Sequence, residues 1–365
     1  MQLIEVSNRF DLKRFIRFPY KIFQDAPQWV PPMNEDEWSK LDPNKSPFVR
    51  THRWKMWMVL YQDQIVGRIW AGQEKQDPDM ITWSWWDQIN DVAVTKLLFQ
   101  AVENWANEVG GQYLEGPTGF TAFDKNALLT DGFDELPTIA EHYHKPYYKD
   151  LLHQIGIEPF RPYLSYRIQI PEKVPDKIRR MSQLLQERNG WMIRQPKSQS
   201  EIRKVADEVF DLINRSHHVL EGHKPIPQDI GRYYVEGFLP LLLPQYCCLV
   251  YKEEKLIGFG IALPSYSRAF QKMKGKIWPL GWWQILKTKR RHEAADLLLI
   301  GVEPKYQKKG VTACIFEAIM SQFIKRGIRY VESNPELEDN LAVQTLWKDY
   351  HPKCTKKRMI YRNML

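Results

Sequence analysis

The feature of this sequence that most constrains its fold is an internal repeat. When the second half is laid on the first with a shift of 217 positions, seven residues coincide in the 22 positions from Val94 to Glu115. The coincidences fall on a run typical of a helix, on the glycine that ends it and on the strand that follows. Two earlier pairs, Val66-Gly67 and Ile257-Gly258, end similar hairpin sequences. Because chance would give only about one or two coincidences, the pattern predicts a duplicated domain.

Length and composition agree with two domains. A chain of 365 residues suits two units of about 150 to 200 residues each, and the pattern restarts after Pro171. We therefore expect domains at 1–170 and 171–365. Apolar residues make up 43% of the chain, enough for packed cores. No apolar run approaches the roughly 18 residues of a membrane span, and the first residues lack the apolar core of a signal peptide, so we expect a cytoplasmic protein.

The two halves are expected to share one order of elements, in which a hairpin is followed by a strand, a helix and a further strand. In the first half, the expected elements are the helix Arg9–Phe23, the hairpin 56–72, the strand Ile81–Trp86, the helix Ala93–Val109 and the strand Tyr113–Glu115. In the second half, they are the helices Glu201–Ser216 and Gly231–Leu243, the hairpin 247–263, the strand Asp296–Val302, the helix Val311–Lys325 and the strand Arg329–Glu332.

A basic turn leads into the last of these helices. Residues 307–310, Gln-Lys-Lys-Gly, immediately precede Val311. A helix N-terminus carries unpaired amides and a positive dipole end, and a glycine lets the backbone approach a bound group closely. The turn therefore predicts a phosphate-binding seat, with an ordinary basic connection as the alternative. The aligned residues 90–93 contain an acidic residue and no glycine, which predicts that only the second copy binds an anion.

This turn is neither a Walker loop nor a GxGxxG fingerprint. It resembles the pyrophosphate-binding motif of the GNAT family of acyl-CoA N-acyltransferases, [QR]-x-x-G-x-[GA], with Gln307, Gly310 and Thr312 at its defined positions and Thr312 departing from the usual small residue. The resemblance covers 191–365 in element order and, more loosely, the first half. The stretches GPTGFTAFDKNALLTDGFD and NPELEDN are similar to those of an uncharacterised group of tandem bacterial proteins. The resemblance implies an α/β (α+β) chain of two tandem GNAT-like domains, of which the first is degenerate. Each domain would be a mixed, mostly antiparallel sheet flanked by helices.

The resemblance also implies a co-substrate, acetyl-CoA or another acyl-CoA, and no metal. The pantetheine arm would pair with the main chain of the strand before the turn, and the pyrophosphate would sit on the turn. The residues implied to hold the cofactor are Ile300, Val302, Gln307, Lys308, Lys309, Gly310, Val311, Thr312 and Asn340.

Transfer in this family is direct, without a covalent enzyme intermediate. The resemblance implies Asp296 or Glu332 as the group that accepts the proton of the attacking amine, with a solvated charge or a salt bridge as the alternative for each. Trp347 stands where many relatives carry a tyrosine that protonates the departing thiolate, and an indole cannot do this. Tyr350, one turn later, is the expected substitute.

A long insertion, residues 264–295, replaces the short turn that joins two strands in compact family members. Eight basic residues and no acidic ones lie between Tyr266 and His292, which equals the whole net charge of +8. The insertion could cover an apolar tunnel with its tryptophans, dock on an anionic membrane, bind an acidic acyl carrier protein, or simply pack on the first domain with its lysines in water. Because the rest of the chain is nearly neutral, we expect no nucleic-acid binding.

Other candidate sites carry less weight. His142, His144 and the pair 217–218 lack further ligands at a usable spacing, so we expect no metal site. The four cysteines match no disulfide or zinc pattern. We therefore expect an acyl-CoA-dependent N-acyltransferase, and first of all an N-acetyltransferase, acting on a small-molecule amine. Two alternatives remain: a non-catalytic CoA-binding module, and a long-chain N-acyltransferase that uses acyl carrier protein.

Overall fold

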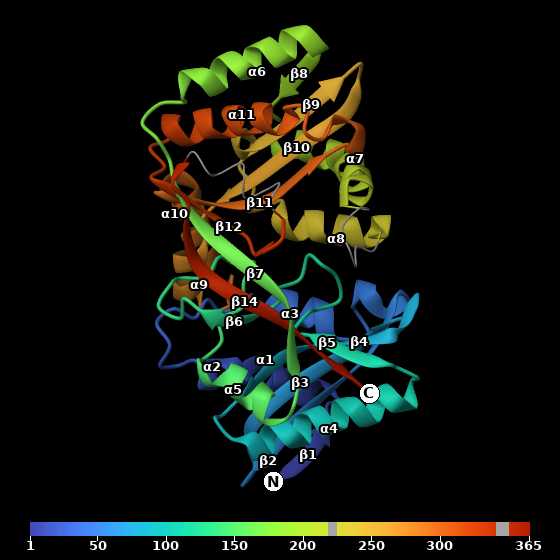
Figure 1. Ribbon diagram of the computed structural model, residues 1–365. Helices are drawn as coiled ribbons and strands as arrows, with labels where there is room; N and C mark the ends of the chain where they lie inside the picture. Colours follow the sequence, from blue (N-terminus) through green and yellow to red (C-terminus); the bar gives the residue numbers. More distant parts are fainter. Residues whose placement is uncertain (218–224, 341–349) are drawn as a thin grey trace.

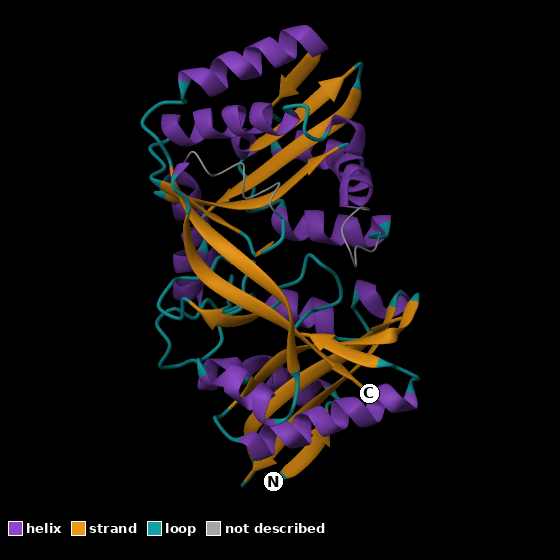
Figure 2. Cartoon of the chain, viewed as in Figure 1, coloured by secondary structure: helices purple, strands orange, loops and turns teal. Residues whose placement is uncertain are grey.

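The structure is a computed structural model, and it describes residues 1–217, 225–340 and 350–365. One twisted sheet runs through both halves of the chain, and helices pack on its faces (Figures 1 and 2). The second half forms one end of the molecule and the first half forms the other. Both termini lie at the end formed by the first half (Figure 1).

The elements of the first half follow the expected order. Its strands are β1 (Gln2–Glu5), β2 (His52–Tyr61), β3 (Gln64–Glu74), β4 (Asp77–Gln88), β5 (Tyr113–Gly116), β6 (Leu128–Asp131) and β7 (Glu158–Gln169). Its α-helices are α1 (Arg9–Arg17), α2 (Pro19–Ile22), α3 (Asn34–Leu41), α4 (Val92–Glu108) and α5 (Tyr147–Gln154).

The second half repeats that order and adds helices. Its strands are β8 (Trp191–Arg194), β9 (Cys247–Lys252), β10 (Lys255–Pro264), β11 (Ala294–Val302), β12 (Tyr330–Ser333), β13 (Glu336–Leu337) and β14 (Lys353–Met364). Its α-helices are α6 (Asp176–Asn189), α7 (Gln199–His217), α8 (Gln228–Phe238), α9 (Ser267–Met273), α10 (Gly281–Arg290) and α11 (Val311–Lys325).

Prolines account for the two helices that differ most from the prediction. The expected helix Arg9–Phe23 is divided, because Pro19 has no amide hydrogen to donate and instead opens α2. The expected helix Gly231–Leu243 ends early, at Phe238, with Pro240 two residues further on.

Parallel pairing occurs at equivalent places in the two copies. β4 pairs with β5 from Met80 opposite Tyr113, and β11 pairs with β12 from Ala294 opposite Tyr330. Tyr113 and Tyr330 coincide in the sequence repeat. The other described strand pairs are antiparallel, so the predicted mixed, mostly antiparallel sheet is confirmed.

The repeated glycines have the same packing role in both copies. A Cβ added at Gly67 would lie 2.5 Å from Val94 Cγ1, and one added at Gly258 would lie 2.6 Å from Val311 Cγ1. In the first copy, helix α4 therefore crosses strand β3 at van der Waals contact, and in the second copy helix α11 crosses strand β10 in the same way. The same contact between helix and sheet is therefore made in both copies. It explains why Val66-Gly67 matches Ile257-Gly258 in the sequence and why Val94 matches Val311.

Two long strands join the halves. β14, from the end of the chain, lies between β5 and β7, while β7, from the first half, lies between β14 and β12. These two strands pair antiparallel from Lys353 opposite Arg167 to Arg362 opposite Glu158. Each half thus completes its sheet with a strand from the other half. The division of the chain at residue 170 stays a prediction.

Buried charges hold this exchange in place. Lys356 of β14 is 1% exposed, and its Nζ lies 3.4 Å from a carboxylate oxygen of Glu141 and 3.2 Å from one of Glu332. Arg358 pairs with Glu141 at 3.3 Å, and Arg167 of β7 pairs with Glu332 at 2.5 Å. Because buried charges are tolerated only when they are paired, the network fixes β14 beside β7 and the segment around Glu141.

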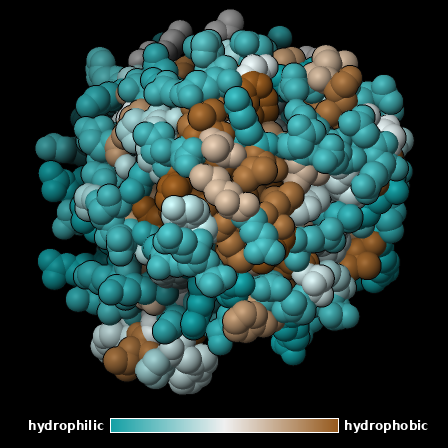
Figure 3. Space-filling model, turned by 90° about the horizontal axis from the view of Figure 1, so that it is seen from below, coloured by the Kyte–Doolittle hydropathy of each residue, from teal (hydrophilic) through white to brown (hydrophobic). Residues whose placement is uncertain are grey.

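The apolar cores also cross between the halves. One cluster packs α4 and α5 on the first part of the sheet, and another packs α11 on the second part. A third joins Phe48 and Phe120 to Phe210 and Phe259 of the second half. Figure 3 shows the end of the molecule formed by the first half, where hydrophobic side chains gather near the centre of a largely hydrophilic face. None of the helices in the described ranges is both long and apolar enough to cross a bilayer.

Candidate active site

The basic turn between β11 and α11 is shaped for an anion. Lys308 and Gly310 have φ values of 59° and 95°, in the left-handed region. A Cβ at Gly310 would also overlap Leu185 Cδ1 of α6, so the position requires glycine on both counts. The turn ends directly at Val311, the first residue of α11.

Most backbone amides of residues 308–312 have no protein acceptor among the described residues. The Lys309 amide donates to the Tyr306 carbonyl at 3.3 Å. Within the part of the chain that the structure describes, the amides of Lys308, Gly310, Val311 and Thr312 have no acceptor, and no side chain caps α11. These amides and the positive end of the helix dipole are the elements that bind phosphate at helix N-termini.

The equivalent helix of the first half is capped by its own chain. Asp91 precedes α4, and its Oδ1 accepts a hydrogen bond from the Ala93 amide at 2.8 Å. A carboxylate therefore occupies the place that an anion would take, and its charge would repel a second one. Of the two equivalent turns, the second is the one whose geometry is open to an anion.

Side chains around the second turn strengthen its positive field. Gln307 Nε2 donates to the Val302 carbonyl at 3.2 Å and so braces the turn against the end of β11. The ammonium groups of Lys252, Lys305 and Lys309 lie between 5.0 and 5.9 Å from the ring centroid of Tyr306. Cations gathered over one aromatic ring raise the local potential for a phosphate group.

A cleft of about 460 Å³ opens where β11 and β12 separate. The parallel pairing of β11 with β12 ends at Leu297 opposite Ser333, after which β13 pairs with β7 instead. The separated strands form the two walls, 297–300 and 333–337. Ile315 of α11, one helical turn after Val311, lines the cleft, so the cleft reaches the helix whose N-terminus carries the open amides.

The wall of β11 is irregular at its centre. Ile261 lies opposite Leu299, but the next residue, Ala262, lies opposite Leu297, so Leu298 is an extra residue in a β-bulge. The Leu298 carbonyl accepts a hydrogen bond from Asn334 Nδ2 of the facing wall at 3.2 Å. Beyond Leu297, no described strand pairs with this edge of β11. Its free main-chain groups can therefore pair with an extended arm of a ligand.

No protein-family model matches the chain. Two curated proteins are similar over most of their length: YghO of Escherichia coli is 24% identical over 98% of this chain and 94% of its own, and a bacterial ceramide synthase of Caulobacter vibrioides is 23% identical over 84% and 82%. A solved tandem GNAT protein from the clavulanic acid biosynthesis pathway superposes over 100% of this chain and 98% of its own, with a TM-score of 0.59 and 12% identity. This chain has the fold of a tandem GNAT protein.

Within the GNAT fold, the residues predicted to bind the cofactor take different places. Ile300 and Asn340 line the cleft, and the Val302 carbonyl is occupied by Gln307. The main-chain amides of 308–312 are the open groups of the turn, apart from Lys309. Their binding of CoA stays a prediction.

The residues predicted to move protons do not line the cleft. Glu332 is engaged by Arg167 and Lys356, as a salt bridge would be. Asp296 is 2% exposed, and burial raises its pKa well above the usual value, while a hydrogen bond with the Ser265 side chain acts to lower it. Tyr350 packs against the core of the second half, and Trp347 lies outside the described residues.

Sequence reasoning expected the first domain to supply wall and support, but it missed an acidic residue of the cleft and the segment by which the first half lines it. Glu336 on β13 lines the cleft, as does the segment 118–122, from the GPTGFTAFDKN stretch. Asp124 fixes this segment, because its Oδ2 accepts hydrogen bonds from the Phe120 and Thr121 amides and its Oδ1 pairs with Lys40. Thr121 Oγ1 in turn lies 2.6 Å from the hydroxyl of Tyr234 on α8.

A second, apolar cavity of about 230 Å³ adjoins the cleft. It lies between the sheet and the helices α7 and α8, and it shares Leu298, Leu299, Asn334 and Pro335 with the cleft wall. The side chains that line it from the two helices are Ile202, Val205, Ala206, Val209, Phe210, Ile213, Tyr234, Val235 and Phe238. This lining suits an aliphatic chain.

No group of three or more His, Cys, Asp or Glu side chains in the described ranges could hold a metal ion. Of the histidines singled out in the sequence, the pair 217–218 ends outside the described residues. His144 Nδ1 accepts a hydrogen bond from the Leu129 amide at 3.1 Å, and burial lowers the pKa of His142 and His144 well below the usual value.

Proposed function

We propose that this tandem GNAT protein is an N-acyltransferase that takes an acyl group from acyl-CoA in the second domain and transfers it to an amine. The observation that carries the proposal is the set of unpaired amides of Lys308, Gly310, Val311 and Thr312 at the start of α11, a helix that also lines a cleft whose β11 edge is free of a described partner. The pyrophosphate would rest on the turn and the pantetheine arm would pair with β11. The first domain would line the cleft with the segment 118–122.

The chemistry would be a direct substitution. The amine nitrogen attacks the thioester carbon, a main-chain amide of β11 stabilises the oxygen anion of the tetrahedral intermediate, and the C–S bond then breaks to release CoA thiolate. One proton leaves the nitrogen and one is returned to sulfur. Asp296 and Glu332 as proton acceptors, and Tyr350 as the donor to sulfur, stay predictions. We propose Glu336 as the acceptor that can act directly, because it lines the cleft.

Two isosteric variants separate these roles. We expect Glu336→Gln to lower turnover about 10²- to 10⁴-fold while CoA affinity stays unchanged, because the amide cannot accept the proton.

We expect Asp296→Asn to keep the turnover of the wild type. Its stability relative to the wild type should increase as pH rises. The raised pKa of Asp296 makes its contribution to stability complete below the unfolded value, near 4, and lost as pH rises through the folded value. Turnover and urea unfolding at several pH values provide the readouts.

The opposite pattern would reject this assignment. If Asp296→Asn abolished turnover and Glu336→Gln did not, the buried aspartate would be the base. If the protein bound CoA without transferring an acyl group to any amine of a broad panel, the non-catalytic module would be the better account.

A second candidate is transfer that involves a long aliphatic chain, and the apolar cavity beside the cleft favours it. The similarity to a bacterial ceramide synthase, at 23% identity, also supports this candidate. In this version, the chain of the donor or of the acceptor would leave the cleft near Leu298 and enter the space between α7 and α8.

Filling the cavity tests that candidate. We expect Ala206→Phe to lower activity toward long-chain donors or acceptors by about 0.8 kcal/mol, or roughly fourfold, for each methylene group that can no longer enter. The same variant assayed with acetyl-CoA and a short amine is its own control, because those substrates do not need the cavity. An equal loss with short and long substrates would mean that the cavity holds no chain.

A further inference from the structure

The insertion of the second domain exposes large apolar side chains on one surface. We define the α10 surface as helix α10 with the turn 278–280 that precedes it. Trp278 is 74% exposed, Leu280 is 73% exposed and Trp283 is 50% exposed. Trp282 and Leu286 are also exposed. Side chains of this size are usually covered in a soluble domain, so their exposure together indicates a binding surface.

The same insertion carries positive charge that the protein does not neutralise. Its cations are Arg268, Lys272, Lys274, Lys276, Lys287, Lys289, Arg290 and Arg291. None of these makes an ion pair with any residue in the described ranges, and no acidic residue lies between 266 and 292. Elsewhere on the surface, exposed arginines such as Arg203 and Arg232 do have carboxylate partners. The charge of the insertion is therefore free to act on an anionic partner.

The inner side of the insertion is fixed to the body of the protein. Phe270 and Met273 of α9 are buried, and Ser267 Oγ donates to the Pro137 carbonyl at 2.6 Å. The Tyr20 hydroxyl donates to the Lys274 carbonyl at 3.1 Å, and the Asn34 amide donates to the Gly275 carbonyl at 2.9 Å. The first domain thus holds α9, while α10 presents its tryptophans outward in a set orientation.

We propose that the α10 surface docks on the surface of an anionic phospholipid bilayer. Tryptophan and leucine enter the boundary between headgroups and acyl chains, and the surrounding lysines and arginines contact anionic headgroups. The exposure of Trp278 and Leu280 favours a bilayer over an acidic carrier protein, because projecting side chains enter a fluid layer without needing matched pockets. This inference rests on the surface alone and is independent of the acyl-transfer proposal.

The position of the docking surface agrees with a lipid-like substrate. Ile285 of α10 packs against the apolar cluster that contains Leu242 and Cys247, and Leu298 packs there as well. Leu242, Cys247 and Leu298 also line the apolar cavity beside the cleft. A connected set of apolar side chains therefore runs from α10 to that cavity.

Vesicle sedimentation of the full chain tests the proposal. We expect binding to vesicles of phosphatidylcholine and phosphatidylglycerol at 3:1, weakening as salt rises, and little binding to phosphatidylcholine alone. The variant Lys287→Glu with Arg290→Glu should bind at least about 25-fold more weakly, since each cation near the surface contributes about fivefold. The variant Trp282→Ser with Trp283→Ser should also bind more weakly, and tryptophan emission of the wild type should shift to the blue on binding.

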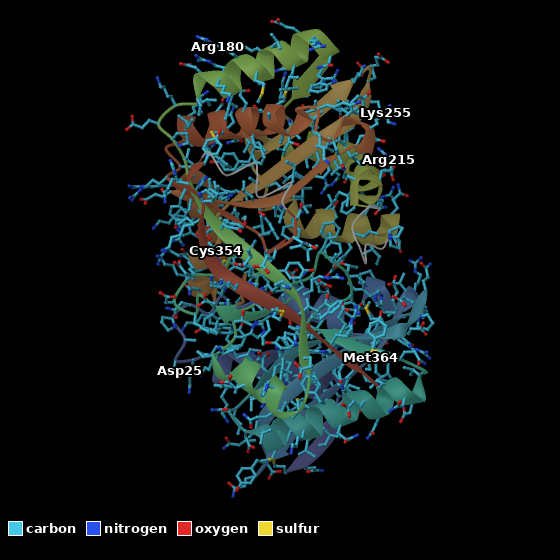
Figure 4. All side chains as sticks on the ribbon, viewed as in Figure 1. Asp25, Arg180, Arg215, Lys255, Cys354 and Met364 are labelled. Atoms are coloured by element: carbon cyan, nitrogen blue, oxygen red, sulfur yellow. The ribbon has the colours of Figure 1, made fainter. Side chains whose placement is uncertain are left out.

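The matched control lies on α6, where Lys177 and Arg180 are exposed. Figure 4 shows Arg180 on the outer side of that helix. Lys177→Glu with Arg180→Glu makes the same change in net charge and should bind vesicles like the wild type. Equal losses in both charge variants would mean non-specific attraction and would overturn the proposal. Failure of the wild type to bind anionic vesicles, with or without binding of an acidic carrier protein, would overturn it too.

Discussion

Replacing Lys356 by methionine is expected to lower the free energy of unfolding by about 3 kcal/mol, the low end of the range for breaking a buried ion pair. Lys356 is 1% exposed and pairs with both Glu141 and Glu332. Burial acts to raise the pKa of Glu141, but the charges of Lys356 and Arg358 outweigh it and the pKa is lowered. The carboxylate is therefore ionised at neutral pH and would lose one of its two cations.

The loss should not exceed this value, because each carboxylate keeps one partner: Arg358 for Glu141 and Arg167 for Glu332. Lys357, the exposed neighbour on β14, supplies the control, and Lys357→Met should change stability by less than about 0.5 kcal/mol. Urea unfolding of the three proteins measures both values. If Lys356→Met unfolded at the same urea concentration as the wild type, the buried network would not hold β14 in place.

Copying the cap of the first GNAT domain into the second is expected to abolish most CoA binding. In Gly310→Asp, a carboxylate would stand before α11 as Asp91 stands before α4, and it would both take the open amides and repel phosphate. The loss of one or two charge-assisted hydrogen bonds corresponds to about 10- to 100-fold in affinity.

Charge and strain are separated by a matched variant. Gly310→Asn carries the same left-handed strain and the same overlap with Leu185 but no charge. Both variants are made in a Leu185→Ala background, which relieves the overlap, and calorimetry with CoA compares them. We expect the asparagine variant to bind clearly more tightly than the aspartate variant. Equal affinities would show that the turn does not hold the phosphates.

Local patterns predicted much of the fold. The bounds of α11 match the sequence prediction, because the apolar period and the glycine stop are both local signals. The exchange of β7 and β14 was not foreseen. Strand pairing over such sequence distances depends on contacts such as Lys356 with Glu141, which are 215 residues apart in the chain and leave no local pattern.

The site divides in the same way. The glycine turn at the start of α11 could be predicted, since its glycine, its lysines and the helix start lie within a few residues. The apolar cavity could not, because α7, α8 and β11 form it jointly. Glu332 shows the limit for single residues: its position on β12 suggested a base, but whether Arg167 of the other half engages it is decided by the exchanged strands.

We propose that the open amides of Lys308, Gly310, Val311 and Thr312 bind the phosphates of CoA and that the capped helix of the first domain does not. Hydrogen–deuterium exchange with and without saturating CoA measures this at the amides themselves. We predict that exchange slows at least about tenfold in peptides covering 308–313 and stays unchanged in those covering 91–96. Bound CoA without slower exchange at 308–313, or with equal slowing in both copies, would contradict the account.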